Sequence, residues 1–168
     1  MHSFTLRKLK HRLKSQRKTF RRLLSRIERK PPRNIQQIAA KAAEKVWDEV
    51  ACLSCANCCK VMTPTYTPAD VKRIAAHLEI SVDEMKARWL KKDRSGDWVN
   101  RSTPCQFLDL KTNFCSIYEV RPADCAGFPH LNKRKVTDYL HVHKQNIDEC
   151  PATFKMVERM EELMGNQQ

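Results

Sequence analysis

The stretch CLSCANCCK, residues 52–60, dominates the organisation of this chain. It places Cys52, Cys55, Cys58 and Cys59 in the pattern CxxCxxCC. Two-residue spacings let successive thiolates turn toward one centre, while the intervening backbone N–H groups soften the charge on the sulfurs. No apolar segment of a secretory signal follows the charged N-terminus, so we expect a cytoplasmic location, where structural disulfides are rare. Clustered cysteines in that setting indicate metal ligation or redox chemistry.

Four further cysteines come from separate segments of the chain: Cys105, Cys115, Cys125 and Cys150. Eight thiolates would suffice for two sites of four ligands each. The neighbours Cys58 and Cys59 are expected to direct their side chains apart and to serve different roles or different metals.

Two kinds of metal centre fit this inventory. Zinc takes four thiolates in a closed tetrahedral site that contributes directly to folding. An iron–sulfur cluster also takes four thiolates, and bacterial ferredoxins combine CxxCxxC with a Cys-Pro pair. Cys150 and Pro151 supply a remote Cys-Pro pair, but the short ferredoxin step to the fourth cysteine is absent. Zinc and an iron–sulfur cluster therefore both stay open.

Composition excludes several other classes of function. Among 168 residues there are only three glycines, and they lie far apart, so no Gly-rich phosphate loop exists. No run of about 18 apolar residues is present, which predicts no transmembrane segment. The net charge of +13 is uneven, because residues 1–33 hold 13 Lys and Arg against a single acid, Glu28.

The basic N-terminal segment has a helical period. Leu6, Leu13, Phe20 and Ile27 recur every seven residues, which predicts an amphipathic helix with a narrow apolar seam and cations on the opposite face. Two prolines at positions 31 and 32 end the predicted helix. The seam could pack on the rest of the protein and leave the charges solvated. The alternatives are an Arg-rich targeting sequence or docking to an anionic partner, namely nucleic acid, a membrane surface or an acidic protein.

The remainder is predicted to be mainly helical. Caps and periodicity predict helices over residues 34–50, 68–79 and 81–92 and from Pro151 onward. Short strands are predicted over 98–101 and 136–142, with a hairpin over 106–118. The predicted fold is thus mainly α with a small β-hairpin and an irregular cysteine-rich metal-binding core packed by helices. We expect a basic amphipathic helical arm at 1–33 and a cysteine-cluster metal-binding domain at 34–165.

Three other residue groups are candidates for supporting roles. His141 and His143 would face the same side of the predicted strand, where they could ligate a metal or stay solvated. His130 follows Phe-Pro beside the cysteines and is the better substitute ligand. Arg121 is expected to donate to loop carbonyls or offset thiolate charge rather than to bind an anion.

Four linked motifs carry a resemblance to a known family: CLSCANCCK at 52–60, PCQFLD at 104–109, FCSIYEVRPADC at 114–125 and FP at 128–129. Together they resemble the CxxCxxCC cysteine-cluster proteins, which are described as zinc- or iron-chelating domains. The resemblance implies ligand roles for Cys52, Cys55, Cys58, Cys59, Cys105, Cys115 and Cys125. Cys150 lies outside these motifs, and its predicted role rests on the Cys-Pro pair.

The same family is similar to the cysteine-rich part of flagellin lysine methylases, and some members are labelled iron–sulfur oxidoreductases. The resemblance therefore implies metal binding first. An iron–sulfur redox enzyme or a methylase-like enzyme that uses the cluster is the alternative, because function belongs to a site and not to a fold.

Overall fold

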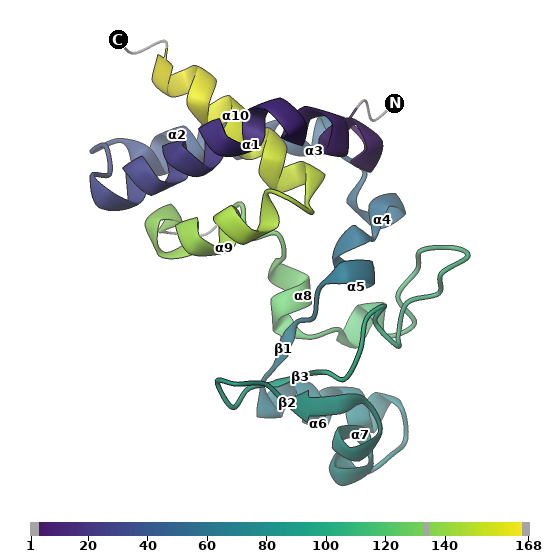
Figure 1. Cartoon of the computed structure of the whole chain (residues 1–168). Coiled ribbons are helices and arrows are strands. Elements are labelled where there is room, and N and C mark those ends of the chain that lie inside the picture. Colours follow the sequence, from purple (N-terminus) through teal and green to yellow (C-terminus); the bar gives the residue numbers. More distant parts are fainter. Residues whose placement is uncertain (1–3, 133–134, 166–168) are drawn as a thin grey trace. The chain divides into compact units, whose positions relative to one another are not determined.

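The structure is a computed structural model that describes residues 4–132 and 135–165 (Figure 1). The chain is mainly α with a small antiparallel sheet, as predicted. It divides into two compact units, which we name the helical unit (residues 1–55 and 129–168) and the sheet unit (residues 56–128). No helix among the described residues is both long enough and apolar enough to cross a bilayer.

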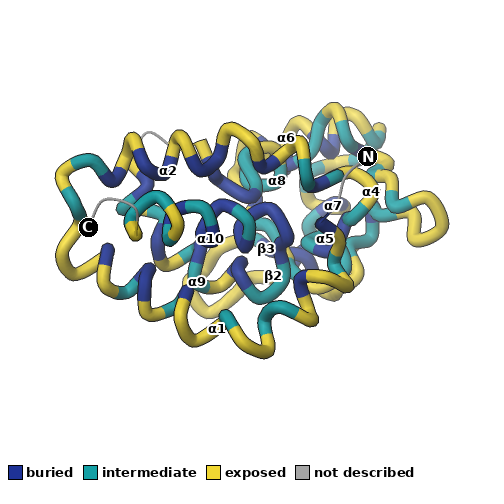
Figure 2. The backbone as a smooth tube through the Cα atoms, turned by 90° about the horizontal axis from the view of Figure 1, so that it is seen from above, coloured by how far each residue is buried: buried dark blue, intermediate teal, exposed yellow. Residues whose placement is uncertain are grey.

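The helical unit is built from seven described elements: α1 (Leu6–Arg29), α2 (Ile35–Glu44), α3 (Val46–Glu49), α4 (Cys52–Cys55), the 3-10 helix η2 (Val136–Tyr139), α9 (Leu140–Asn146) and α10 (Pro151–Gly165). Helix α10 contacts both α1 and α2, and Figure 2 shows it between them. In the core of this unit, the Phe154 ring of α10 stacks on Phe4 at 5.5 Å between ring centroids and contacts Phe20 edge-on at 5.1 Å. The first and last parts of the chain therefore share one core.

Helix α1 buries the predicted seam in this core. Of the seam residues, Phe20 and Ile27 are fully buried and Leu6 and Leu13 are half-buried, and Leu9 is fully buried beside them. The basic side chains of α1 are exposed or half-buried. Arg17 also forms a two-bond fork with Asp148, at 3.0 and 2.6 Å. The interpretation of a packed amphipathic helix is confirmed, while the functional division between residues 33 and 34 stays a prediction.

The sheet unit contains α5 (Asn57–Val61), β1 (Thr65–Tyr66), α6 (Pro68–His77), α7 (Val82–Trp89), β2 (Leu90–Lys92), β3 (Trp98–Asn100), the 3-10 helix η1 (Tyr118–Val120) and α8 (Ala123–Gly127). The strand order is β1-β3-β2 and both pairings are antiparallel, with Tyr66 opposite Trp98 and Leu90 opposite Asn100. Its core consists of Tyr66, Val71, Ile74, Ala75, Met85, Leu90, Phe107 and Ile117. Cys105 and Cys115 pack against this core from its edge.

Several predicted element boundaries are wrong. The helix predicted over 81–92 ends at Trp89, because the buried Leu90 continues as β2 against β3. The helix predicted over 34–50 is interrupted at Lys45. The hairpin predicted over 106–118 is a set of turns around a single bridge between Leu108 and Cys115.

The strand predicted over residues 136–142 is also wrong, since η2 and α9 occupy this segment. Buried residues recur here at Val136, Leu140, His143 and Ile147, which is the spacing of one helix face. A run of seven residues is too short for its pattern to distinguish a strand from a helix.

Candidate metal centre

Five of the eight cysteines belong to the sheet unit, and backbone hydrogen bonds join the segments that carry them. Cys58 and Cys59 lie in α5, and Cys125 lies in α8. The backbone N–H of Cys105 donates to the carbonyl oxygen of Cys59 at 2.8 Å. Cys115 is held by its bridge to Leu108, just beyond Cys105. These contacts collect segments that are distant in sequence.

Four of these thiols lie close enough to influence one another electrostatically. Burial raises the pKa of Cys125, and the neighbouring Cys59, Cys105 and Cys115 raise it further. Burial is also the main cause that raises the pKa of Cys105 and of Cys115, and Cys59 adds to both. Mutual destabilisation of thiolates is the behaviour expected of a ligand set before a cation compensates its charge.

Two backbone donors are already directed at the sulfurs. The N–H of Phe107 bonds to Cys105, and the N–H of Ile117 bonds to Cys115, in each case two residues after the cysteine. Both bonds lower the pKa of the thiol they reach and so oppose the effect of burial. Hydrogen bonds of this kind stabilise metal-bound thiolates and tune the metal they hold.

Cys58 and Cys59 do not direct their side chains apart as expected. Their Sγ atoms lie 4.0 Å from each other, because consecutive positions of a helix differ by only about 100°. The pKa of Cys59 is lowered to about 7; the hydrogen bond with Cys58 is the main cause, Lys60 adds to it, and burial opposes both. Whether the two cysteines serve different metals stays a prediction.

A buried polar group that the sequence did not reveal supports Cys105. Asn100, only 2% exposed, accepts hydrogen bonds at Oδ1 from the Tyr66 hydroxyl at 2.6 Å and from Gln106 Nε2 at 3.1 Å. The Asn100 side chain lowers the pKa of the Cys105 thiol, while its Nδ2 makes no hydrogen bond within the described residues. We therefore expect Asn100 to act as a positioning residue for the candidate ligands.

Asp70 has a comparable role for the helix that carries Cys125. It is 1% exposed, and its carboxylate accepts from the N–H of Ala123 at 3.0 Å, from Arg73 at 2.6 Å and from Thr67. Burial would raise the pKa of Asp70, but these hydrogen bonds outweigh it and the pKa is lowered. The Thr67-x-x-Asp70 capping box was visible in the sequence, whereas the bond to α8 was not.

The helical unit contains the other three cysteines. Cys52 is exposed and Cys55 is half-buried on α4, and Cys150 is buried just before α10. Burial raises the pKa of Cys150, and Cys55 raises it further, so these two thiols are neighbours. The CxxCxxCC motif therefore crosses the boundary between the units, at Ala56, which adopts a left-handed conformation.

The structure confirms the expectation for Arg121 but not the one for His141 and His143. His141 is exposed and His143 is fully buried, so the expectation that both face one side is wrong, because the segment is helical. His130 is buried against Tyr139, and its rank as a substitute ligand stays a prediction. Arg121 donates to the Tyr118 carbonyl at 2.5 Å and covers the Tyr118 ring, which confirms its structural interpretation.

The donor chemistry of the sheet unit fits a thiophilic metal, since five thiols and directed N–H groups meet in one region. Within residues 4–132 and 135–165, no three Cys, His, Asp or Glu side chains are yet gathered tightly enough to hold an ion. Binding would thus require the thiol side chains to converge.

Comparison with known proteins agrees with this donor set. The model of the CxxCxxCC family, described as a "putative zinc- or iron-chelating domain", matches residues 51–151. An uncharacterized protein of Methanocaldococcus jannaschii is 37% identical over 81 residues, which is 47% of this chain and 43% of that relative. The chain therefore spans less than half the length of this relative, and no solved structure matches it. Because the family model covers more than half of the sequence, the chain belongs to the CxxCxxCC family of zinc- or iron-chelating domains.

Proposed function

We propose that this protein chelates zinc or the iron of an iron–sulfur cluster through four thiolates of the sheet unit: Cys59, Cys105, Cys115 and Cys125. The observation that carries the proposal is that the fold joins the segments of these cysteines: the Cys105 N–H donates to the Cys59 carbonyl oxygen at 2.8 Å, and Cys115 is bridged to Leu108. The effect of the other three thiols on the pKa of Cys125 is consistent with this arrangement. Four thiolates satisfy a closed tetrahedral zinc site and equally the iron atoms of a cluster.

The supporting residues would hold the ligands in place before the metal arrives. The main-chain bond from Cys105 to Cys59 and the Asp70 bond to α8 fix three of the four ligand segments. The thiol side chains would then converge on the ion, with Zn–S distances of about 2.3 Å. A bound metal would link segments from the whole sheet unit and add its binding free energy to folding.

The remaining predicted ligands are Cys52, Cys55, Cys58 and Cys150, and they keep that status from their sequence spacing. A cytoplasmic location is part of the proposal, because metal-ligating thiolates require the reduced cysteines that a reducing compartment maintains. An iron–sulfur redox or methylase-like activity stays the alternative, and it would require the cluster form of the centre.

The test is anaerobic purification of the full chain, followed by metal analysis, sulfide analysis and a visible spectrum. A brown protein with iron and acid-labile sulfide selects the cluster, and a colourless protein with zinc selects the structural ion. Cys125→Ser should abolish metal binding by the sheet unit and lower the metal content of the chain. Ser116→Ala, an exposed change beside Cys115, should keep the full content.

Two results would overturn the proposal. One is a full chain that takes up neither zinc nor iron with sulfide during anaerobic reconstitution. The other is a folded Cys125→Ser variant that retains the metal content of the parent chain. Far-UV circular dichroism of both variants establishes that any loss reflects the ligand and not unfolding.

A further inference from the structure

Helix α1 presents a row of cations on the side opposite its buried seam. We name the cationic face by its five members: Arg7, Lys14, Lys18, Arg22 and Arg29. At 3.6 residues per turn they lie within an arc of about 80°, and at 1.5 Å per residue they extend over about 33 Å. All five side chains are exposed. In Figure 2 the outer edge of α1 is correspondingly exposed and its inner edge is buried.

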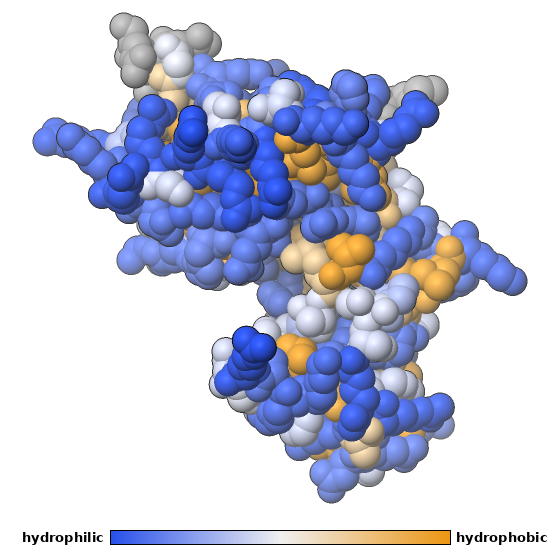
Figure 3. Space-filling view, in the orientation of Figure 1, coloured by the Kyte–Doolittle hydropathy of each residue, from blue (hydrophilic) through white to orange (hydrophobic). Residues whose placement is uncertain are grey.

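The charges of this face are not used to hold the protein together. Arg12, Arg17 and Arg21 lie on the flanks of the helix and bind the unit's own acids, with Arg12 pairing to Glu158 and the other two to Asp148. Across the described part of the chain, no ion pair involves a member of the cationic face. Figure 3 shows the most hydrophilic side chains gathered over α1. Because the arginines of α1 that pair with these acids lie on its flanks, the cationic face exposes a surface of purely positive charge to solvent.

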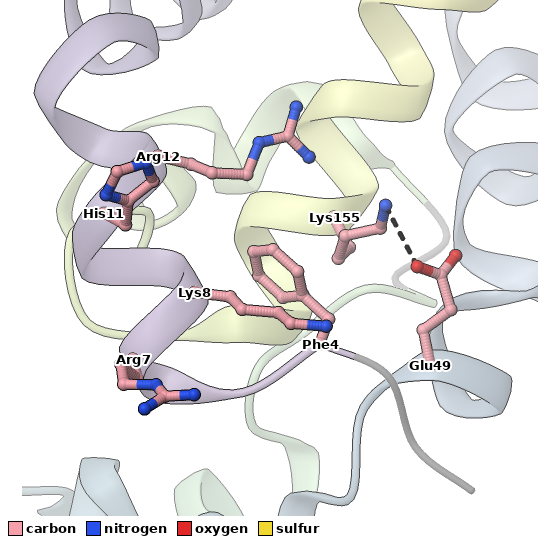
Figure 4. A pocket seen from close by; sticks show the side chains of 7 residues that line it. All are labelled: Phe4, Arg7, Lys8, His11, Arg12, Glu49 and Lys155. Carbon is pink, nitrogen blue, oxygen red and sulfur yellow. Dashed lines mark ion pairs between the residues drawn. The ribbon is translucent and has the colours of Figure 1, made fainter.

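A pocket of about 570 Å³ extends this surface at the N-terminal end of α1 (Figure 4). Its lining residues are Phe4, Arg7, Lys8, His11, Arg12, Glu49 and Lys155. The single acid, Glu49, is paired with Lys155 at 3.0 Å, as the dashed line in Figure 4 marks. The pocket therefore adds positive charge beside Arg7 and continues the cationic face instead of interrupting it.

We propose that the cationic face binds the phosphate backbone of double-stranded nucleic acid, independently of the metal centre. The ligand must be a long, regular polyanion, because the face is straight, carries one sign of charge and is about as long as one turn of a duplex, 34–36 Å. Contacts to phosphates position a protein on a duplex without reading its bases. DNA and RNA share this chemistry, so binding should not depend on base sequence.

The same observations argue against the two other anionic partners. A membrane-bound amphipathic helix inserts its apolar side, but here Leu9, Phe20 and Leu24 are fully buried in the core. The exposed large hydrophobic residues, among the described positions, lie outside α1. An acidic protein surface would be matched by a compact patch, whereas this face is a line of cations along the helix. The face also has no aromatic residue on which single-stranded bases could stack.

The test measures binding of the full chain to fluorescent duplexes of about 20 base pairs, DNA and RNA, each in two unrelated sequences. If each of the five cations neutralises one phosphate and displaces its counterion, the affinity for the duplex should fall on the order of 500-fold between about 50 and 200 mM salt. The triple variant Lys14→Gln, Lys18→Gln, Arg22→Gln should show a log–log salt slope about 2.7 smaller in magnitude, and hence only roughly a 12-fold fall.

A matched control removes the same charge from the sheet unit: Lys72→Gln, Lys91→Gln, Lys111→Gln. These three side chains are also exposed, so both triple variants should melt like the parent chain. The control should keep the parent's affinity and salt slope. Equal loss in both variants, or no binding of the parent chain to any duplex at about 50 mM salt, would overturn the proposal. Binding to vesicles with anionic lipid but not to duplexes would assign the face to a membrane surface instead.

Discussion

The backbone N–H of Cys105 donates to the carbonyl oxygen of Cys59 over 2.8 Å, which joins two candidate ligands through the main chain. A main-chain bond fixes the distance between the two ligand segments whatever their side chains do. The thiols can therefore change rotamer while their backbones stay in place. This arrangement suits a centre whose ligands converge only when a metal binds.

Asp70→Ala should destabilise the sheet unit and release helix α8, because it removes the acceptor for Thr67, Arg73 and the N–H of Ala123. Losing buried hydrogen bonds to a charged group should lower the free energy of unfolding by about 3 kcal/mol. Urea unfolding of the metal-free chain, followed by the fluorescence of Trp89 and Trp98, measures this. Asp83→Ala, an exposed change in the first turn of α7, should cost less than about 1 kcal/mol.

The lowered pKa of Asp70 also predicts a pH dependence. A carboxyl whose pKa is lower in the folded state contributes stability above its unfolded pKa, about 3.9, and loses it as pH falls through the folded value. Relative to the parent chain, Asp70→Asn should therefore be less destabilised in acid than at neutral pH. If the difference in free energy of unfolding between the parent chain and Asp70→Asn stays constant from neutral to acid pH, this role of the ionised Asp70 is contradicted.

Asn100→Ala should weaken metal retention, because the side chain that lowers the pKa of Cys105 would be lost, and with it the acceptor for Tyr66 and Gln106. Removing a supporting contact of this kind typically costs about 10- to 100-fold in metal affinity. Tyr66→Phe removes only the hydroxyl donor and should have a smaller effect. Competition with a chelator measures the metal affinities of the parent chain, Asn100→Ala and Tyr66→Phe. Equal affinities would argue against a positioning role for Asn100.

His143→Leu should make the helical unit less sensitive to mild acid. Burial is the main cause that lowers the pKa of His143 to about 4, and His130 and His141 add to it. The folded state therefore favours the neutral form of His143. The contribution of this preference to the free energy of unfolding is fully present above about pH 6.5 and is lost as pH falls toward 4. The parent chain should lose up to about 3 kcal/mol over this window.

The measurement is urea unfolding by far-UV circular dichroism at several pH values. His141→Gln is the matched control, since His141 lies two residues earlier on the same helix and is exposed. It should keep the pH dependence of the parent chain. If His143→Leu keeps it as well, the titration of another group causes the decline.

Ala56→Gly should stabilise the sheet unit. Ala56 has a φ of +45° between α4 and α5, a left-handed conformation that costs an L-residue roughly 1–2 kcal/mol and costs glycine little. We expect a gain of about 1 kcal/mol in thermal or urea unfolding. Ala76→Gly, at an exposed helical position of α6, should have the opposite sign and lose about 1 kcal/mol. A loss at both positions would show that the conformation of Ala56 is not strained.

The sequence predicted those elements whose signals are local. The helices predicted from residues 68 and 81 begin where expected, capped by Thr67 and Ser81, and the apolar seam of α1 is buried. These features are predictable because caps and helical periods involve neighbouring residues. The strand predicted over 136–142 is wrong because a run of seven residues is too short to distinguish the period of a strand from that of a helix. Asn100 and Asp70 could not have been identified as partners of Cys105 and Ala123, because a single sequence contains no record of contacts between distant segments.

Residue types and their spacing show which chemistry is available: the cysteine pattern, the family and a basic segment that carries nearly all of the net charge. Folding brings together the thiols that share one region, since Cys59 reaches Cys105, Cys115 and Cys125 only through the fold of the sheet unit. Folding also sets which cations face solvent, because burial of the α1 seam fixes the helix orientation and the unit's own acids neutralise only its flanks. The physical reason is that residue type sets what a group can bind, whereas distance and burial set what it does bind.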